Sequence, residues 1–134
     1  MTFQNLNLWA ILAAALSAFL VGGLWYSPVL FGSAWKKANG FADGYPPAAG
    51  AKIFVVSFIL SLVMAVNLAL FLNDAKTTLA WGATAGFLAG FGWVAMGIAV
   101  VSLFERRPWS YILVNGGYLT VALVLMGAIL GGWR

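Results

Sequence analysis

Four long apolar runs dominate the pattern of the chain. They cover residues 8–26, 53–72, 79–104 and 111–133, and no Lys, Arg, Asp or Glu falls inside any of them. A helix needs about 20 apolar residues to cross a hydrocarbon core of about 30 Å, and a charge at its centre would cost roughly 2.5–3.5 kcal/mol. The pattern therefore predicts four membrane-spanning helices. A soluble bundle would need a polar stripe on each helix, and these runs are apolar all round.

The connections between the runs predict how the helices are joined. Residues 73–78 and 105–110 are short links, which place consecutive helices side by side and antiparallel. Residues 27–52 form the one long connection. The first run has no basic segment before it, so we interpret it as a retained helix rather than a secretory signal. We expect an all-α fold, an integral membrane four-helix bundle formed by residues 1–134 as a single domain.

The long connection contains a second, weaker helical pattern at residues 28–40. Phe31, Ala34, Trp35 and Ala38 recur at helical spacing, and the Asn-Gly pair at 39–40 is typical of a helix end. We therefore expect a short interfacial helix on the membrane surface after the first span.

Composition narrows the possible chemistry. Of the 134 residues 63% are hydrophobic and only 7% are charged, and the chain has no histidine and no cysteine. Thiol chemistry, histidine bases and the usual ligands of zinc, haem and iron–sulfur clusters are thereby excluded. No Asp, Glu, Lys, Arg or His lies within a span to relay protons, and the basic residues are too few for a nucleic-acid surface. We expect no enzyme activity, no cofactor, no metal site and no nucleic-acid partner.

The basic residues also predict the orientation in the membrane, because cytoplasmic loops carry the excess of Lys and Arg. The loops after the first and third spans hold five of them, whereas the opposite side holds Lys76 and Arg134. Both termini should therefore face outward. Four basic side chains on the inner side are expected to contact lipid headgroups: Lys36, Lys37, Arg106 and Arg107.

Small residues at four-residue spacing mark the faces through which the helices are expected to pack. In the third and fourth spans these are the glycines Gly82, Gly86, Gly90, Gly127 and Gly131. Further glycines at 92, 97, 116 and 117 exceed what one bundle needs, so we also consider contact with another chain, with Gly86 as the test position. The alternative is that glycine and alanine are simply frequent in membrane helices.

Two asparagines are the most polar residues inside the spans. At a rise of 1.5 Å per residue, Asn67 and Asn115 lie at different depths and cannot pair. Asn115 is within reach of Ser57, Tyr26 or Ser27, and we favour a structural hydrogen bond over a solute site. Glu105, in the second inner connection, is placed to bridge to a lysine at 36, 37 or 52.

Two stretches resemble the DUF1761 family of small bacterial membrane proteins. One is residues 23–28 (GLWYSP) with Phe31, Gly32 and Trp35. The other runs from residues 104–105 (FE) and 107–109 (RPW) through 115–118 (NGGY) to 127–130 (GAIL) and Trp133. The resemblance covers essentially the whole chain and implies a bacterial cytoplasmic membrane, but no assigned function.

The residues that match the family pattern also suggest a site. Several of them should lie at one depth near the inner membrane surface, as a cluster that positions the interfacial helix or receives a partner. They are Trp25, Tyr26, Pro28, Gly32, Trp35, Glu105, Pro108, Trp109, Asn115 and Tyr118.

Two functions remain open from the sequence. The first is a non-catalytic membrane protein that acts by helix packing, as an accessory subunit of a larger membrane complex or as a homo-oligomer; its partners are membrane lipids and other subunits or itself. The second is a small oligomeric channel or transporter for a neutral solute. Only a broken polar stripe runs along the spans, at Ser57, Ser61, Asn67 and Thr84, so we favour the first.

Overall fold

The computed structural model describes residues 3–134, and every regular element in them is helical. In chain order these are α1 (Leu8–Trp25), α2 (Gly32–Asn39), α3 (Ala51–Phe71), α4 (Leu79–Ala89), the π-helical segment η1 (Gly90–Ala95), α5 (Met96–Phe104) and α6 (Trp109–Gly132). The prediction of an all-α fold is confirmed. α4, η1 and α5 follow one another without a break and form one long helix.

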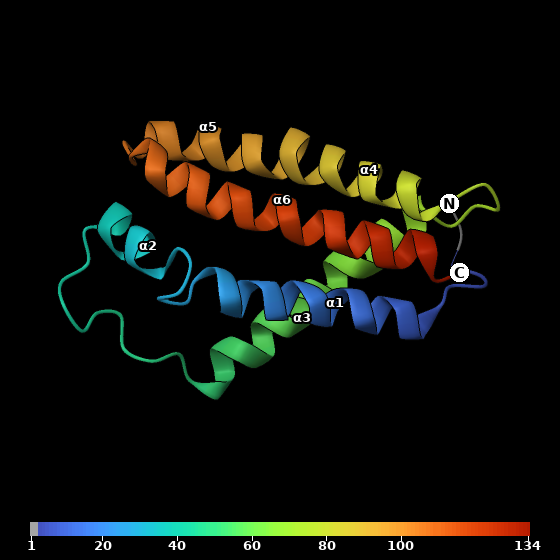
Figure 1. The fold of residues 1–134 in the computed structure, drawn as a ribbon, viewed down its shortest axis with the longest axis horizontal. Coiled ribbons are helices and arrows are strands. Elements are labelled where there is room, and N and C mark those ends of the chain that lie inside the picture. Colours follow the sequence, from blue (N-terminus) through green and yellow to red (C-terminus); the bar gives the residue numbers. More distant parts are fainter. Residues whose placement is uncertain (1–2) are drawn as a thin grey trace.

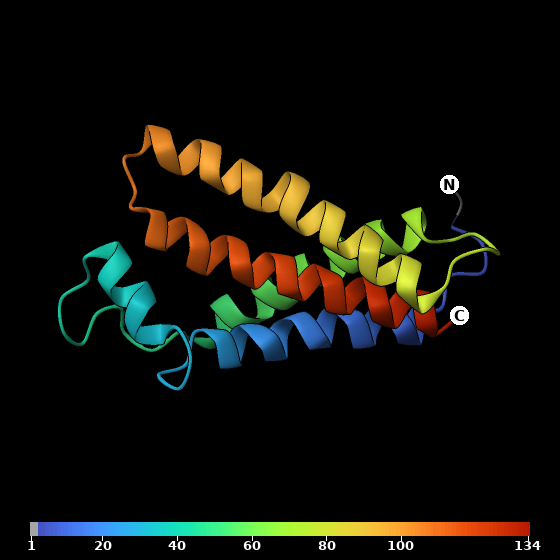
Figure 2. The same ribbon diagram turned by 45° about the horizontal axis from the view of Figure 1, so that its top comes forward.

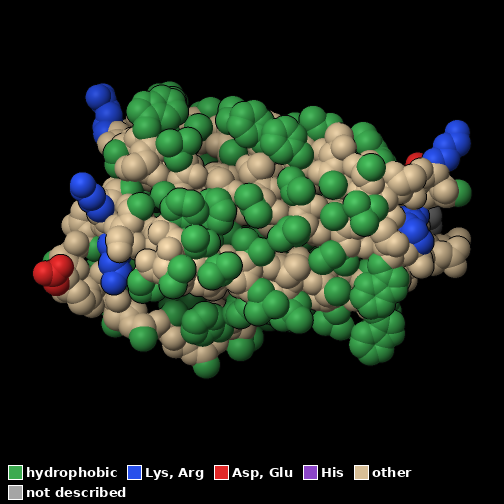
Figure 3. All heavy atoms as spheres, in the orientation of Figure 1, with side chains coloured by type: hydrophobic (Ala, Val, Ile, Leu, Met, Phe, Trp, Pro, Cys, Tyr) green, Lys and Arg blue, Asp and Glu red, His purple; other side chains and the backbone are tan. Residues whose placement is uncertain are grey.

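Within residues 3–134, four helices are long and apolar enough to cross a membrane. They are Leu8–Trp25, Ala51–Phe71, Leu79–Phe104 and Trp109–Gly132, with mean hydropathies between 2.0 and 2.6, and they match the four predicted runs to within two residues at each end. Figure 3 shows basic and acidic side chains at the two ends of the molecule and a broad apolar band between them. The fold is therefore that of a multi-pass membrane helical bundle.

α6 lies at the centre of the arrangement, between α1 on one side and the α4–α5 helix on the other (Figures 1 and 2). α3 packs mainly against α1 and crosses it obliquely. Residues 3–7 and the end of α6 lie at one end of the bundle, and α2 lies at the other (Figure 1). This arrangement agrees with an even number of crossings.

Glycines create the closest contact in the bundle, between α4 and α6. A methyl group on Gly82 would overlap the carbonyl oxygen of Gly127, and a methyl group on Gly86 would overlap that of Leu123. On α6 the Cα of Gly131 likewise lies against Gly82. Without side chains the two backbones touch directly, which is the form of packing that membrane helices use in place of hydrophobic burial.

This contact corrects one sequence-based expectation. Gly86 is buried inside the chain, between α4 and α6, so it is not available to a second copy. Two of the four glycines regarded as surplus are also used internally: Gly116 lies against Ala95, and Gly117 lies against the ring of Trp25. The other two, at positions 92 and 97, face open space.

Beyond η1, the third span leaves α6. Gly90 still lies against the backbone of Thr120, and Ala95 is buried, but further along α5 Val100 and Phe104 are exposed. Figure 2 shows the gap widening between α5 and the start of α6. A π-helical turn contains one residue more than an α-helical turn and so rotates the helix beyond it, which gives α5 a different face toward α6 than α4 has.

Small residues are buried on both α1 and α3, and Phe19 of α1 packs edge-on against Phe54 and Phe58 of α3. Ala14 and Ala18 of α1 are buried, as are Ser61, Ala65 and Ala69 of α3. Within each helix these residues are spaced by four, so they lie on one face. Small side chains of this kind allow membrane helices to approach closely.

The interfacial helix begins later than predicted. Residues 28–31 form turns, and α2 starts at Gly32 rather than at 28, because the carbonyl of Ser27 accepts from the N–H groups of Leu30 and Gly32 (3.1 and 2.9 Å). Its end is as expected, since Gly40 adopts a left-handed conformation with φ 67° that favours glycine.

Candidate functional site

The end of the bundle that carries α2, which the charge distribution predicts to be the inner one, holds a hydrogen-bonded contact between α1 and α6. The hydroxyl of Tyr26 donates to Oδ1 of Asn115 over 2.6 Å, and Nδ2 of Asn115 donates to the carbonyl of Tyr111 over 3.1 Å. Of the three partners that the depth of Asn115 allowed, Tyr26 is therefore the one observed. Ser57 is exposed on α3, where its carbonyl accepts from Ser61.

Two more bonds join the same helices. The indole N–H of Trp25 donates to the carbonyl of Val114 over 2.9 Å, and the hydroxyl of Tyr118 donates to the carbonyl of Ala18 over 2.9 Å. Both acceptors are helix carbonyls. Each aromatic side chain thus places its apolar body between the helices and directs its one polar group to the opposite backbone.

Aromatic contacts extend this cluster to α2. The ring of Tyr26 meets those of Trp35 and Tyr118 edge-on, with centroids 5.8 and 5.5 Å apart. A Cβ at Gly32 would lie 2.6 and 2.8 Å from the carbonyl oxygens of Tyr26 and Ser27, so only glycine fits at the start of the helix. The structure therefore brings together Trp25, Tyr26, Gly32, Trp35, Asn115 and Tyr118, which we call the inner cluster.

The other residues of the predicted site lie apart from the inner cluster. Glu105, Pro108 and Trp109 are exposed in and after the turn between α5 and α6, and Pro28 is exposed in the turn before α2. Among residues 3–134, no hydrogen bond, ion pair or ring contact joins these four to the inner cluster. Glu105 pairs with Arg107 of its own turn at 3.5 Å rather than with the expected lysines.

The four basic residues expected at lipid headgroups lie at the same end of the molecule as the inner cluster. Lys36 and Lys37 are exposed in the last turn of α2. Arg106 is exposed with a left-handed φ of 62°, and the guanidinium of Arg107 lies 5.0 Å from the ring centroid of Tyr111. Their headgroup contact stays a prediction.

The polar side-chain groups of the inner cluster are used within the chain. The carboxamide oxygen and nitrogen of Asn115 and the polar side-chain atoms of Trp25, Tyr26 and Tyr118 are each engaged in a bond within the chain. Residues 3–134 contain no group of three His, Cys, Asp or Glu side chains suited to a metal ion. The observed contacts hold α1, α2 and α6 in a fixed relation.

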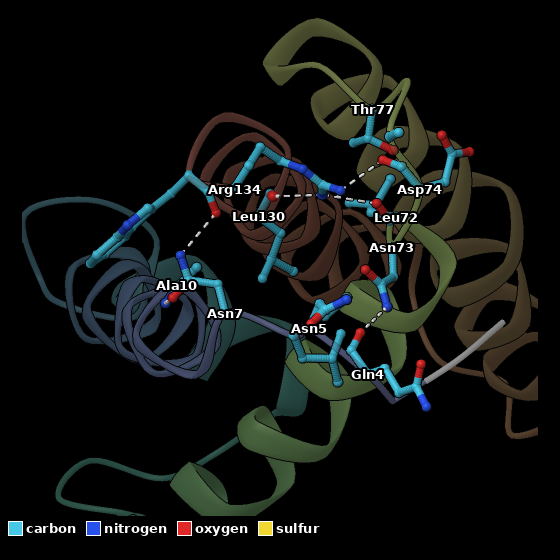
Figure 4. A pocket seen from close by; sticks show the side chains of 14 residues that line it. Gln4, Asn5, Asn7, Ala10, Leu72, Asn73, Asp74, Thr77, Leu130 and Arg134 are labelled. Atoms are coloured by element: carbon cyan, nitrogen blue, oxygen red, sulfur yellow. Dashed lines mark hydrogen bonds between the residues drawn. The ribbon is translucent and has the colours of Figure 1, made fainter.

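A cavity at the opposite end of the bundle was not anticipated from the sequence. It has a volume of about 520 Å³ and is formed by three segments that are far apart in the chain: residues 4–7, the connection between α3 and α4, and the end of α6 with Arg134. Figure 4 shows these segments meeting around it. We call it the outer cavity, after the orientation that the charge distribution predicts.

Arg134 forms hydrogen bonds that join the end of α6 to the connection between α3 and α4. Its Nη1 donates to the carbonyls of Leu72 (2.9 Å) and Leu130 (3.4 Å), and its Nη2 donates to the carbonyl of Asp74 (2.7 Å). On the other wall, Nδ2 of Asn7 donates to the carbonyl of Trp133 over 3.2 Å. The sequence contained no signal for this cavity beyond the prediction that these segments share one side of the membrane.

The second intramembrane asparagine has a different environment from Asn115. Asn67 is exposed on α3, one turn before the helix ends at Phe71. Within residues 3–134, its carboxamide takes part in no hydrogen bond. The expectation that Asn67 and Asn115 do not pair agrees with this arrangement.

Comparison with known proteins gives one finding. The model of a family described as "Protein of unknown function (DUF1761)" matches residues 9–131. Neither the curated proteins nor the solved structures contain a match. The match covers the four long helices except Leu8 and Gly132, the whole inner cluster and eight of the fourteen residues that line the outer cavity; Asn5 and Arg134 lie outside it.

Proposed function

Because the chain belongs to the DUF1761 family, for which no activity is described, we propose a function from its own surface: it is a non-catalytic membrane protein that assembles with copies of itself through the outward side of α3. The observation that carries this proposal is the unpartnered carboxamide of Asn67. The glycine face of the third span is no longer the candidate for contact with a second copy, because the α4–α6 contact within the chain occupies it. The outward side of α3 takes its place.

The polar group of Asn67 is costly where it lies. A carboxamide has two N–H donors and an acceptor oxygen, and acyl chains offer no partner for either. Leaving such a group without a hydrogen bond in an apolar medium costs roughly 2–7 kcal/mol. A second Asn67 across a two-fold axis would supply both a donor and an acceptor, because the contact is self-complementary.

The residues around Asn67 form a continuous seam. Their spacing alternates between three and four residues, and the seam consists of Ile53, Val56, Leu60, Val63, Asn67 and Leu70. The first four are 45–59% exposed. Apolar residues at this alternation are the a and d positions of a left-handed helix pair, in which one asparagine at an a position fixes register and the number of strands.

Observations elsewhere in the molecule support a role in assembly rather than transport or catalysis. Within residues 3–134, the buried core of the bundle consists of alanine, leucine, isoleucine and methionine side chains, which form no polar path for a solute. The polar groups of the inner cluster serve its internal hydrogen bonds. Any pathway for a solute would have to form between copies.

The test uses single cysteines, since the chain has none of its own. Val56→Cys lies on the seam and Val55→Cys lies beside it on the same helix; the two valines are 45% and 58% exposed. Two copies inserted in the same direction run parallel, which brings equivalent seam residues within disulfide range. We expect oxidation in native membranes to produce a dimer with Val56→Cys and little with Val55→Cys.

Asn67→Leu in the Val56→Cys background tests the polar contact itself. Interhelical hydrogen bonds in membranes contribute about 0.6 kcal/mol each, so the loss of two should weaken association about eightfold. Equal cross-linking at the two valines would refute self-assembly through this seam. Cross-linking of Val56→Cys to a different protein would replace it with the accessory-subunit role.

A further inference from the structure

The outer cavity has the build of a binding site. Ala10, Ala69 and Leu130 supply apolar parts of its wall, whereas its polar lining includes amides, a hydroxyl, the acidic residue Asp74 and the guanidinium of Arg134. A volume of about 520 Å³ is within the range of pockets that hold small molecules, and such pockets combine apolar walls with a few polar groups.

Arg134 brings a positive charge that no carboxylate side chain neutralises. The three acceptors of its guanidinium are backbone carbonyls, and among residues 3–134 the ion pair formed by side chains is that of Arg107 with Glu105 at the other end. In Figure 4 the carboxylate of Asp74 is directed away from Arg134. Three hydrogen bonds use three of the five guanidinium N–H groups, which leaves two for a ligand.

Thr77 provides a second, independent observation. It lines the outer cavity and is only 8% exposed, and its buried hydroxyl has no hydrogen-bond partner among the described residues. Buried hydroxyls in proteins are nearly always bonded, so an orphaned one indicates a missing partner. Asn5, which also lines the cavity, makes no hydrogen bond with its carboxamide within residues 3–134.

The free groups around the outer cavity are mainly donors: two N–H groups of Arg134, the hydroxyl of Thr77 and the amide of Asn5. They match a ligand that is anionic and rich in acceptor oxygens, and a guanidinium fork binds phosphate in this way. The carboxylate of Asp74, which also lines the cavity, accepts from the backbone N–H of Lys76 over 2.6 Å, and the side chain of Lys76 adds a positive charge at this end. Trp9 and Trp133, exposed at the same end, mark the level at which lipid headgroups lie.

We propose that the outer cavity binds a phosphate group, with Arg134, Thr77 and Asn5 as its donors. Two sources carry this chemistry at a membrane surface, the headgroup of a phospholipid and a soluble phosphate ester. The apolar part of the wall, formed by Ala10, Ala69 and Leu130, receives the carbon skeleton next to the phosphate. This binding is independent of assembly through α3, since none of the seam residues lines the cavity.

The test compares two substitutions that remove one positive charge from the same end. Arg134→Gln takes away the guanidinium in the outer cavity, whereas Lys76→Gln changes a residue that does not line it. Delipidated protein in a non-ionic detergent is titrated with phosphatidylglycerol, read by native mass spectrometry, and with glycerol 3-phosphate, read by thermal unfolding. We expect binding to weaken about tenfold or more for Arg134→Gln and by about twofold at most for Lys76→Gln.

Thr77→Val separates ligand binding from folding. Valine keeps the shape of threonine without its hydroxyl, so the unliganded variant should be at least as stable as the natural protein, while its affinity for the phosphate ligand falls. Binding of phosphatidylglycerol alone assigns the site to a lipid headgroup, and binding of glycerol 3-phosphate assigns it to a soluble ester. Absence of both, or equal losses in Arg134→Gln and Lys76→Gln, overturns the proposal.

Discussion

At the scale of single residues, the fold depends on where side chains are absent. At four positions in the α4–α6 contact, Gly82, Gly86, Gly127 and Gly131, a methyl group would meet backbone of the facing helix or the chain just before it. A backbone cannot move aside as a side chain can, so each substitution must separate the helices. The same residue type at 92 and 97 faces open space.

Gly86→Ala should therefore destabilise the protein, and Gly97→Ala should not. Overlap with the carbonyl of Leu123 is expected to lower the free energy of unfolding by about 1–3 kcal/mol or more. Alanine at 97 removes the helix penalty of glycine, which is worth up to about 1 kcal/mol. Unfolding by SDS titration in mixed micelles measures both, and equal effects of the two substitutions would contradict the observed packing.

Tyr26→Phe tests the hydrogen bond at the centre of the inner cluster. Removing the hydroxyl leaves Oδ1 of the half-buried Asn115 without its donor, which we expect to cost about 1–3 kcal/mol in the same titration. Tyr45→Phe is the control, because Tyr45 is exposed and keeps its ring contact with Phe41. A Tyr26→Phe protein as stable as Tyr45→Phe would show that the bond contributes nothing.

At the scale of elements, the sequence predicts the depth of a residue along a helix axis better than the direction in which its side chain points. The rise per residue fixes depth, so Tyr26 was correctly placed within reach of Asn115. The spans are apolar all round, so nothing in their pattern states which helix each face meets. Three features depend on which helix each face meets, and the sequence did not predict them. They are the partner of the Gly86 face, the divergence of α5 after η1 and the outward direction of Asn67.

The start of α2 was missed for a local reason. Helical spacing continues back to Phe31, but the carbonyls of Trp25 and Ser27 take the N–H groups of Phe31, Leu30 and Gly32 in turns. Hydrophobic periodicity depends on side chains, so it cannot predict hydrogen bonds between neighbouring backbone groups. The outer cavity was missed because its three segments are far apart in the sequence and come together only when the chain folds.

Gly32→Ala should loosen α2 from the rest of the bundle. A methyl group there would meet the carbonyls of Tyr26 and Ser27, so α2 must shift and its contact between Trp35 and Tyr26 must weaken. We expect faster tryptic cleavage after Lys36 and Lys37, with the long helices intact. Gly50→Ala, in the same connection but with open space around it, is the control, and equal cleavage in both variants would show that Gly32 does not anchor α2.

At the scale of the whole molecule, two chemically different ends are separated by an apolar band (Figure 3). One end has the inner cluster, α2 and five of the basic residues; the other has the outer cavity, Lys76 and Arg134. The two proposals concern separate regions, since the seam runs along α3 while the cavity lies at its end. The orientation of the protein in the membrane therefore determines whether the cavity is exposed to the lipids and solutes of the outer surface or to those of the cytoplasmic surface.

The charge distribution predicts that the end with α2 is cytoplasmic, because the excess of Lys and Arg is retained on that side. Ala42 and Ala75 are exposed residues of the same type in connections at opposite ends. With no natural cysteine in the chain, a membrane-impermeant maleimide should label Ala75→Cys in intact cells and Ala42→Cys only after the membrane is opened. The reverse pattern would invert the molecule and place the outer cavity on the cytoplasmic surface, where soluble phosphate esters are its candidate ligands. Labelling of both in intact cells would mean that the two ends do not lie on opposite sides of a membrane.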